Sequence, residues 1–183
     1  MDSGASSYRH FREGDTAAFE RIVKEYFDPL VFFLYRYVGD YAASEDIAMD
    51  AFAYVWAFPR HYNGKVSFKT YLFMLGRSRA LDYIKHRSKL TMLPLEDVGE
   101  QAATQPSLEE LLLTDLRKKV VHRALTQLPE DMRLTVHLTF FEEMSAEQIA
   151  KVLKKNKKQI YNLLYRAKKQ LRTILGKEGE ELL

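Results

Sequence analysis

Two closely spaced helix starts near the carboxyl end of the chain restrict its fold more than any other feature. Residues 145–171 read SAEQIAKVLKKNKKQIYNLLYRAKKQL. Ser145 with Gln148 matches the capping-box pattern, in which two side chains satisfy free backbone amides at a helix start, and Asn156 with Gln159 repeats it eleven residues later. The pattern predicts two short helices around a tight turn, an arrangement typical of helix-turn-helix readers of duplex DNA.

The second of these helices is predicted to have a cationic outer face. Nine Lys or Arg residues and no acid lie from Lys151 to Arg172. This density of positive charge suits binding to a polyphosphate backbone, and without such a ligand the repulsion between the cations would destabilise the helix. A helical wheel places apolar residues on the inner side, namely Ile160, Leu164, Ala167 and Leu171. The opposite side carries Lys158, Asn162, Tyr165 and Lys169.

These outward residues are candidates for contact with duplex DNA. In a major groove, Asn or Gln suits adenine and Lys suits guanine, so Lys158 and Asn162 are the expected readers of base edges. The full predicted duplex-binding set is Lys157, Lys158, Gln159, Tyr161, Asn162, Tyr165, Arg166 and Lys169. The alternative is a solvated, lysine-rich helix with no DNA role.

Composition favours a cytoplasmic binding protein over an enzyme. The 183 residues are 46% hydrophobic, enough for a core, and the absence of cysteine excludes disulfides and thiolate metal sites. The five histidines lack metal-ligand spacing, and no catalytic signature is present, so no metal, cofactor or enzymatic activity is expected. We also see no signal peptide and no apolar run near the ~20 residues that a membrane span needs.

The uneven distribution of charge predicts the boundaries of two domains. Residues 1–90 carry 13 basic and 11 acidic side chains, 91–115 carry six acids and no base, and 116–183 carry 15 bases and eight acids. We therefore expect one domain at 1–90, a flexible acidic linker at 91–106 and a second domain at 107–183. The fold is expected to be all-α, because Val, Ile and Thr in the first domain are too scattered for strands and helix caps recur in both domains. A capping box at Ser107 predicts that a helix begins there.

In the first domain, Asp15 is expected to cap a helix over 16–38, and Gly39 with Asp40 to separate it from the next helix. The core stripe of that next helix is predicted to contain Ile47, Ala48, Ala51, Phe52, Val55 and Trp56. Its opposite face carries Asp46, Asp50, Ala53 and Ala57, acids and small residues against which a basic partner helix would fit. The alternative is that this face of the helix is an ordinary solvated surface without a partner.

The following loop and helix start interleave aromatic and cationic residues. Aromatic faces that accept unstacked bases, next to cations that bind phosphates, are what single-stranded nucleic acid requires. The candidates are Arg60, His61, Tyr62, Asn63, Lys65, Phe68 and Lys69, with Ser67 as the cap of a helix to about residue 88. Phe68 is an alternative core residue, whereas His61, Tyr62 and Asn63 are expected to be exposed.

Taken together, the blocks GDYAASEDIAMDAFAYVWAF, SFKTYLFMLGRSRALDYIKHR and SAEQIAKVLKKNKKQIYNLLYRAKKQL resemble the extracytoplasmic-function (ECF) group of bacterial sigma-70-type sigma factors. The resemblance covers about 15–175 and implies that 1–90 is region 2 and 107–183 is region 4. It implies binding of Asp46, Asp50, Ala53 and Ala57 to the β′ clamp helices of core RNA polymerase, capture of an opened −10 strand by the 60–69 segment, and reading of the −35 duplex by the second helix of the basic block.

The resemblance further implies contact of region 4 with the β flap, and an anti-sigma factor as a partner. Some positions depart from the family pattern: Lys154 stands where a turn Gly is common, and Leu163 where an Arg often holds phosphate. A helix-turn-helix regulator that binds duplex DNA without polymerase is the rival interpretation, and a nucleic-acid enzyme is disfavoured because Asp46 and Asp50 point outward.

Overall fold

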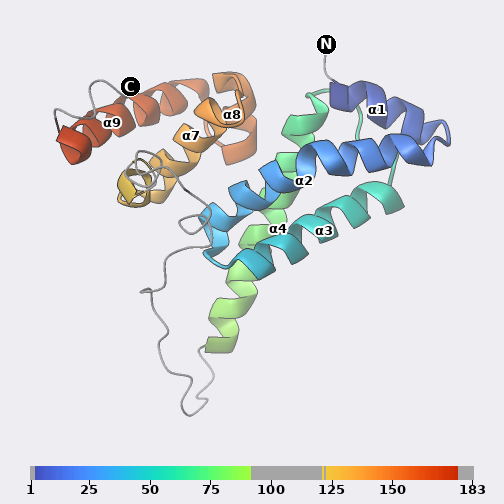
Figure 1. Cartoon of the computed structure of the whole chain (residues 1–183), viewed down its shortest axis with the longest axis horizontal. Helices are drawn as coiled ribbons and strands as arrows, with labels where there is room; N and C mark the ends of the chain where they lie inside the picture. Colours follow the sequence, from blue (N-terminus) through green and yellow to red (C-terminus); the bar gives the residue numbers. More distant parts are fainter. Residues whose placement is uncertain (1–2, 92–120, 122, 177–183) are drawn as a thin grey trace.

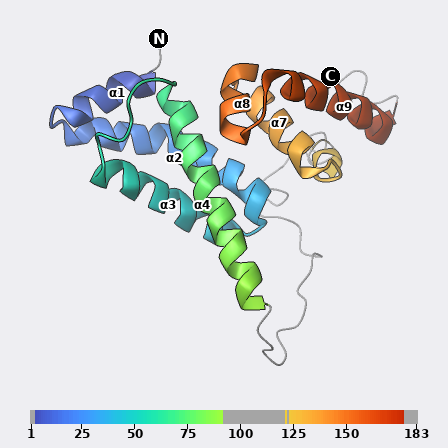
Figure 2. The ribbon, with the colours of Figure 1, turned by 180° about the vertical axis from the view of Figure 1, so that it is seen from behind.

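The computed structural model describes residues 3–91, 121 and 123–176. These residues form helices and connecting loops, with no strand among them, which confirms the predicted all-α class. The amino-terminal lobe consists of α1 (Ser3–Arg12), α2 (Thr16–Val38), α3 (Tyr41–Ala57) and α4 (Phe68–Thr91). The carboxy-terminal lobe contains α7 (Glu130–Phe140), α8 (Ala146–Leu153) and α9 (Lys157–Leu175). Figures 1 and 2 show the lobes side by side.

Helix ends in the amino-terminal lobe fall where their caps predict them. The Asp15 carboxylate accepts a hydrogen bond from the Ala18 amide, and Asp40 does the same for Ala43. Between these two caps, Gly39 ends α2 in the left-handed conformation at φ 71°, which a residue without Cβ adopts freely. Pro29 lies inside α2, and the helix continues past it. The Ser67 hydroxyl accepts from the Thr70 amide at the start of α4.

The helices of the amino-terminal lobe pack around a core of aromatic and branched aliphatic side chains. Helix α2 lies against α1, α3 and α4 and supplies much of this core, including Leu30, Phe33 and Leu34. At Gly76 of α4 a Cβ atom would lie 2.8 Å from Leu30 Cδ1, so the missing side chain lets α4 approach α2 closely.

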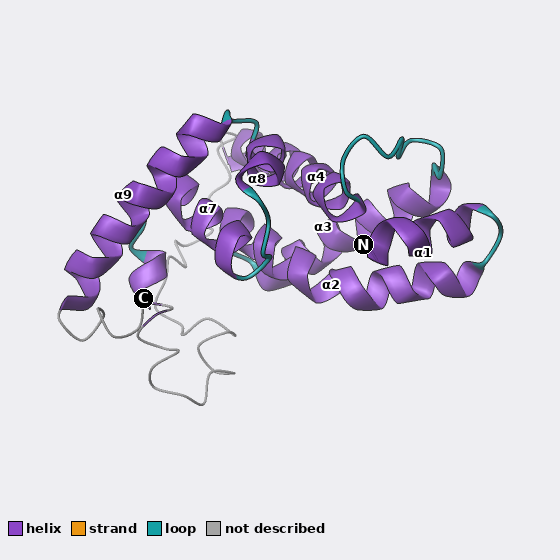
Figure 3. Cartoon of the chain, turned by 90° about the horizontal axis from the view of Figure 1, so that it is seen from above, coloured by secondary structure: helices purple, strands orange, loops and turns teal. Residues whose placement is uncertain are grey.

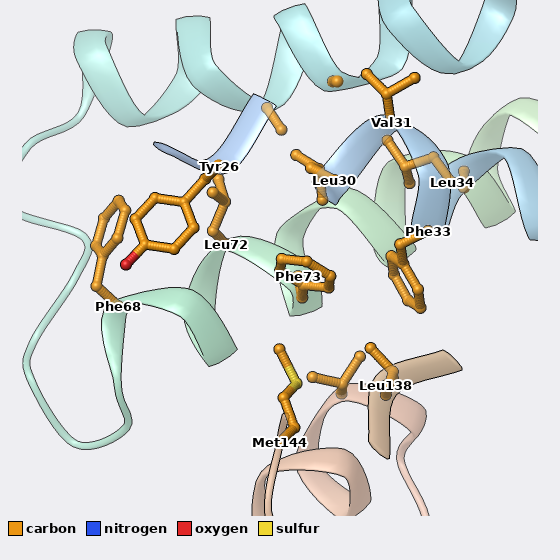
Figure 4. Packing of buried hydrophobic residues seen from close by; sticks show 14 of the residues in the cluster. Tyr26, Leu30, Val31, Phe33, Leu34, Phe68, Leu72, Phe73, Leu138 and Met144 are labelled. Atoms are coloured by element: carbon orange, nitrogen blue, oxygen red, sulfur yellow. The ribbon is translucent and has the colours of Figure 1, made fainter. Parts of the chain in front are cut away.

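The two lobes share one hydrophobic cluster. Leu138 of α7 and Met144 of the α7–α8 loop lie beneath Phe33 and Phe73 of the amino-terminal lobe (Figure 4). Helix α8 packs against α4, and α7 packs against α2. The prediction of two helical units stands, but here the units are joined through a common core. The predicted linker at 91–106 and the helix start at Ser107 fall, apart from Thr91, outside the described residues.

Candidate functional site

Both predicted capping boxes of the helix-turn-helix are formed. The Ser145 hydroxyl accepts from the Gln148 amide at 3.3 Å, and the Gln148 side chain accepts from the Ser145 amide at 2.8 Å. At the start of α9 the reciprocal pair joins Asn156 and Gln159, with both bonds at 2.8 Å. Lys154 closes α8 in the left-handed region at φ 53°, where the family pattern often has a glycine. The two helices are therefore set at a fixed turn by their own side chains.

The predicted division of α9 into a buried and an exposed face is confirmed. Ile160, Ala167 and Leu171 are buried, and Leu164 is partly buried. All eight predicted duplex-binding residues are exposed, with Tyr161 at 55% and Tyr165 at 72%. Viewed from above, α9 runs along the outer edge of the carboxy-terminal lobe, at the end of the molecule away from α1 (Figure 3). Among the described residues, the side chains of the cationic face are therefore exposed to solvent.

Within the described part of the chain, the side chains of two of these eight residues form intramolecular hydrogen bonds. The Gln159 carbonyl oxygen is used in the cap, so its amino group is the part that remains for a base edge. Lys157 donates to Glu147 at 2.8 Å, which lowers the pKa of Glu147 and raises that of Lys157. Because this pair is exposed to solvent, salt screens it and a phosphate can compete for the ammonium.

Helix α3 presents the predicted acidic face to solvent. Asp46, Asp50, Ala53 and Ala57 are all exposed. Met49, which the sequence analysis did not single out, is 56% exposed beside them. This face therefore combines two carboxylates with small and apolar side chains, as a docking site for a cationic amphipathic helix would.

The prediction that Trp56 lies in the core is wrong. Its side chain is 47% exposed, although the other five residues of the predicted stripe are buried. The indole lies at the edge of the lobe, with its ring centroid 5.1 Å from Phe11 and 4.9 Å from Phe19. Trp56 thus borders the acidic face and remains available to a partner.

In the loop formed by residues 58–67 and at the first residue of α4, the structure corrects the predicted exposure of two strand-binding candidates. Tyr62 was expected to be exposed but is 8% exposed, and its hydroxyl donates to the Val66 carbonyl at 2.7 Å. Phe68 is fully buried, as its alternative core assignment anticipated. The two rings meet edge to face at 5.4 Å, and both contact Tyr8 of α1. These rings support the loop from below and do not offer an open face.

The exposed part of the loop is polar and cationic. Arg60, His61, Asn63 and Lys65 are all exposed. The His61 ring stacks on Phe58 at 5.1 Å and 9° and lies 2.7 Å from the Tyr54 hydroxyl through Nδ1. Phe58, which is 47% exposed, was not recognised in the sequence, and its stacking with His61 fits the surface that an unstacked base requires.

Lys69, the last predicted strand-binding residue, is bound to the other lobe. Its ammonium lies 2.8 Å from a carboxylate oxygen of Glu142 and also donates to the Glu142 carbonyl at 2.8 Å. Glu142 is buried next to His137, whose Nε2 lies 3.4 Å from the carboxylate. Burial alone would raise the pKa of Glu142, but His137 and Lys69 together lower it below its usual range. The lowered pKa favours the ionised form of Glu142, which pairs with a Lys69 side chain that is only 26% exposed.

Sequence comparison decides the family. The family profile described as "Sigma-70 region 2" matches residues 22–90, and that described as "Sigma-70, region 4" matches 118–171, which together span more than half of the chain. The chain belongs to the ECF group of sigma-70 factors. Region 2 falls on the amino-terminal lobe and the described part of region 4 falls on the carboxy-terminal lobe.

Individual relatives agree with this family. The chain is 27% identical over 168 residues to the RNA polymerase sigma-H factor of Pseudomonas aeruginosa, covering 87% of both chains. It is 23% identical to the ECF sigma factor SigW of Bacillus subtilis, covering 91% of this chain and 94% of SigW. Its fold is similar to that of the sigma factor RpoE in the complex with the anti-sigma factor NepR from Bartonella quintana, with a TM-score of 0.68, 20% identity, and coverage of 86% and 96%.

Across the described residues, no helix is long and apolar enough to cross a membrane. In the same part of the chain, no group of three or more His, Asp or Glu side chains is arranged to hold a metal ion.

Proposed function

We propose that this sigma factor binds core RNA polymerase through the exposed face of α3 and reads −35 duplex through α9. Arg60, His61, Asn63 and Lys65 contact the opened −10 strand, and Lys69 joins them once it is released from Glu142. Tyr62 and Phe68 have a supporting role in this scheme because they form the floor of the loop. The polymerase surfaces concerned are the β′ clamp helices for region 2 and the β flap for region 4, and the family resemblance adds an anti-sigma factor as a regulator.

The observation that supports this proposal most is the presence of two unlike exposed faces on two family-matched lobes. The α3 face is acidic and apolar, as suits a protein partner, whereas the α9 face is cationic and polar, as suits DNA. A duplex-binding regulator that acts without polymerase explains α9 but leaves the α3 face and the region 2 match without a purpose.

The proposal is tested at the α3 face. The double substitution Asp46→Lys and Asp50→Lys is expected to weaken binding to purified core polymerase by at least tenfold, because two attractive charge contacts become repulsive. The thermal unfolding midpoint is expected to stay nearly constant, since substitutions at exposed positions usually cost less than about 0.5 kcal/mol. Fluorescence anisotropy of the labelled sigma factor titrated with core enzyme measures the affinity.

Glu20→Lys with Asp28→Lys provides the matched control. It produces the same change in net charge at two exposed positions of α2. If the α3 variant and this control bind core enzyme equally well, the assignment of the α3 face is wrong.

A further inference from the structure

Helix α1 and the 58–67 loop enclose a cleft that the family resemblance does not assign. The cleft has a volume of about 510 Å³, within the usual range for ligand sites. Its lining comes from two separate segments and comprises Ala5, Tyr8, Arg9, Arg12, Glu13, Tyr62, Asn63 and Gly64. Helix α1 precedes residue 22, where the region 2 match begins, so this wall of the cleft lies outside the matched part of the chain.

Helix α1 is held firmly against the rest of the lobe. Tyr8 is 2% exposed, its ring stacks on Phe68 at 4.9 Å, and its hydroxyl donates to the Pro59 carbonyl at 2.7 Å. At Gly4 a Cβ atom would lie 2.6 Å from the Tyr26 hydroxyl oxygen, so the approach of α1 to α2 depends on glycine. The position of α1 relative to the loop is thereby fixed by a buried aromatic contact and a hydrogen bond to the loop itself.

This anchoring places two arginines at the rim of the cleft. Arg9 and Arg12 are exposed, and neither forms an ion pair with a carboxylate within the described residues. Burial raises the pKa of Tyr8 to about 12, and the charge of Arg12, which lines the same cleft, partly opposes this rise. Glu13 is the acid in the lining, so the two arginines leave a net charge of +1.

The opposite wall is polar. The Asn63 side-chain oxygen accepts from the Lys65 amide, which leaves its amino group for a ligand. Gly64 adopts φ 74°, and its surroundings are open, so a ligand can approach the loop backbone. Guanidinium groups on one wall, with an amide and an exposed backbone on the other, fit a phosphate and the sugar attached to it.

We propose that α1 extends the strand-binding surface of the loop, with Arg9 and Arg12 binding backbone phosphates of the opened DNA strand while Asn63 contacts an adjoining base. The proposal rests on the proposed function, because the loop is the segment expected to hold that strand. It adds residues that lie outside both family matches and assigns them a ligand class, single-stranded nucleic acid.

The full-length protein and a short, fluorescein-labelled single-stranded oligonucleotide of mixed sequence test the proposal. Unlabelled duplex is added to saturation so that α9 does not contribute. Arg9→Gln with Arg12→Gln is expected to weaken strand binding about tenfold. It should also make the slope of log affinity against log salt shallower by about 1.4, since each phosphate contact on a single strand contributes about 0.7. Glu13→Gln is expected to strengthen binding, because it removes the repelling carboxylate.

Arg21→Gln with Lys24→Gln removes the same charge from α2 and should leave strand affinity unchanged. Equal affinities in the α1 variant and this control overturn the proposal, as does loss of duplex binding together with strand binding. Competition by a free nucleoside triphosphate as effective as that by the oligonucleotide also overturns it, because the cleft then recognises a small ligand. The assay needs no polymerase, so its failure is distinct from a failure of core binding at the α3 face.

Discussion

At the scale of single residues, Lys154 illustrates a local conflict within the helix-turn-helix. Its φ of 53° lies in the left-handed region, which costs a residue with a Cβ about 1 kcal/mol. Its side chain is exposed. The turn between α8 and α9 nonetheless keeps this conformation, because the capping boxes on either side fix where each helix begins.

We therefore expect Lys154→Gly to raise the free energy of unfolding by about 1 kcal/mol, measured by urea denaturation. Lys151→Gly is the matched control: it is an exposed position inside α8, where glycine should lower the stability by about 1 kcal/mol. A decrease for both variants would contradict the strain assigned to the turn.

At the scale of the elements, we propose that the outward face of α9 separates residues that read bases from residues that bind phosphates. Asn162→Ala is expected to relax base preference at one position of the −35 site, at a cost of about 1 to 3 kcal/mol on the preferred sequence. Lys169→Ala should weaken binding to all sequences equally and make the salt slope shallower by about 0.9. Binding of a randomised duplex library, followed by sequencing, distinguishes the two effects. Uniform loss with Asn162→Ala would mean that α9 docks in another register.

Sequence alone predicted those features of the elements that depend on local chemistry. Four side chains each cap a helix by accepting a hydrogen bond from the amide three residues further on, so their spacing in the sequence predicts their roles: Asp15, Asp40, Ser145 and Asn156. The α9 face followed from periodicity for the same reason. The exposure of Trp56 and of Tyr62 was predicted wrongly because it depends on α1. This helix covers the Tyr62 ring and leaves the Trp56 ring at the edge of the lobe. The periodicity of one segment cannot predict such a contact with another segment.

At the scale of the whole molecule, the contact between the lobes involves Lys69, a residue of the proposed strand-binding surface. Lys69 is held by Glu142 of the α7–α8 loop, and Gln148 of α8 donates to the Ser67 hydroxyl at 3.1 Å, so the start of α4 is joined to the other lobe at two points. A sequence-based assignment of two domains could not anticipate this contact, since it joins residues more than seventy positions apart.

Glu142→Lys is expected to separate the lobes, because it places two cations together at a buried contact. The chain has no cysteine, so Glu20→Cys with Gln170→Cys allows specific dye labelling, and energy transfer between the dyes should fall. Glu143→Lys changes the charge equally at an exposed neighbour and should leave transfer unchanged. Unchanged transfer in Glu142→Lys would contradict a role for this contact in holding the lobes.

The same contact has a predictable response to pH. The pKa of Glu142 is lowered while the lobes are in contact, so the ionised carboxylate stabilises this contact above the usual pKa of a glutamate. The stabilisation is lost as the pH falls through the lowered pKa. In the dye-labelled chain without a substitution at Glu142, energy transfer should therefore decrease in acid. The same labelled chain with Glu142→Gln should not show this decrease.

The most direct test of the central claim is run-off transcription by purified bacterial core polymerase on a library of linear promoters, with this protein as the added sigma factor. We predict transcripts that begin at a fixed distance downstream of shared −35 and −10 sequences and that require the added protein. Specific binding of the protein to duplex DNA, with no transcript dependent on it from any promoter, would contradict the claim.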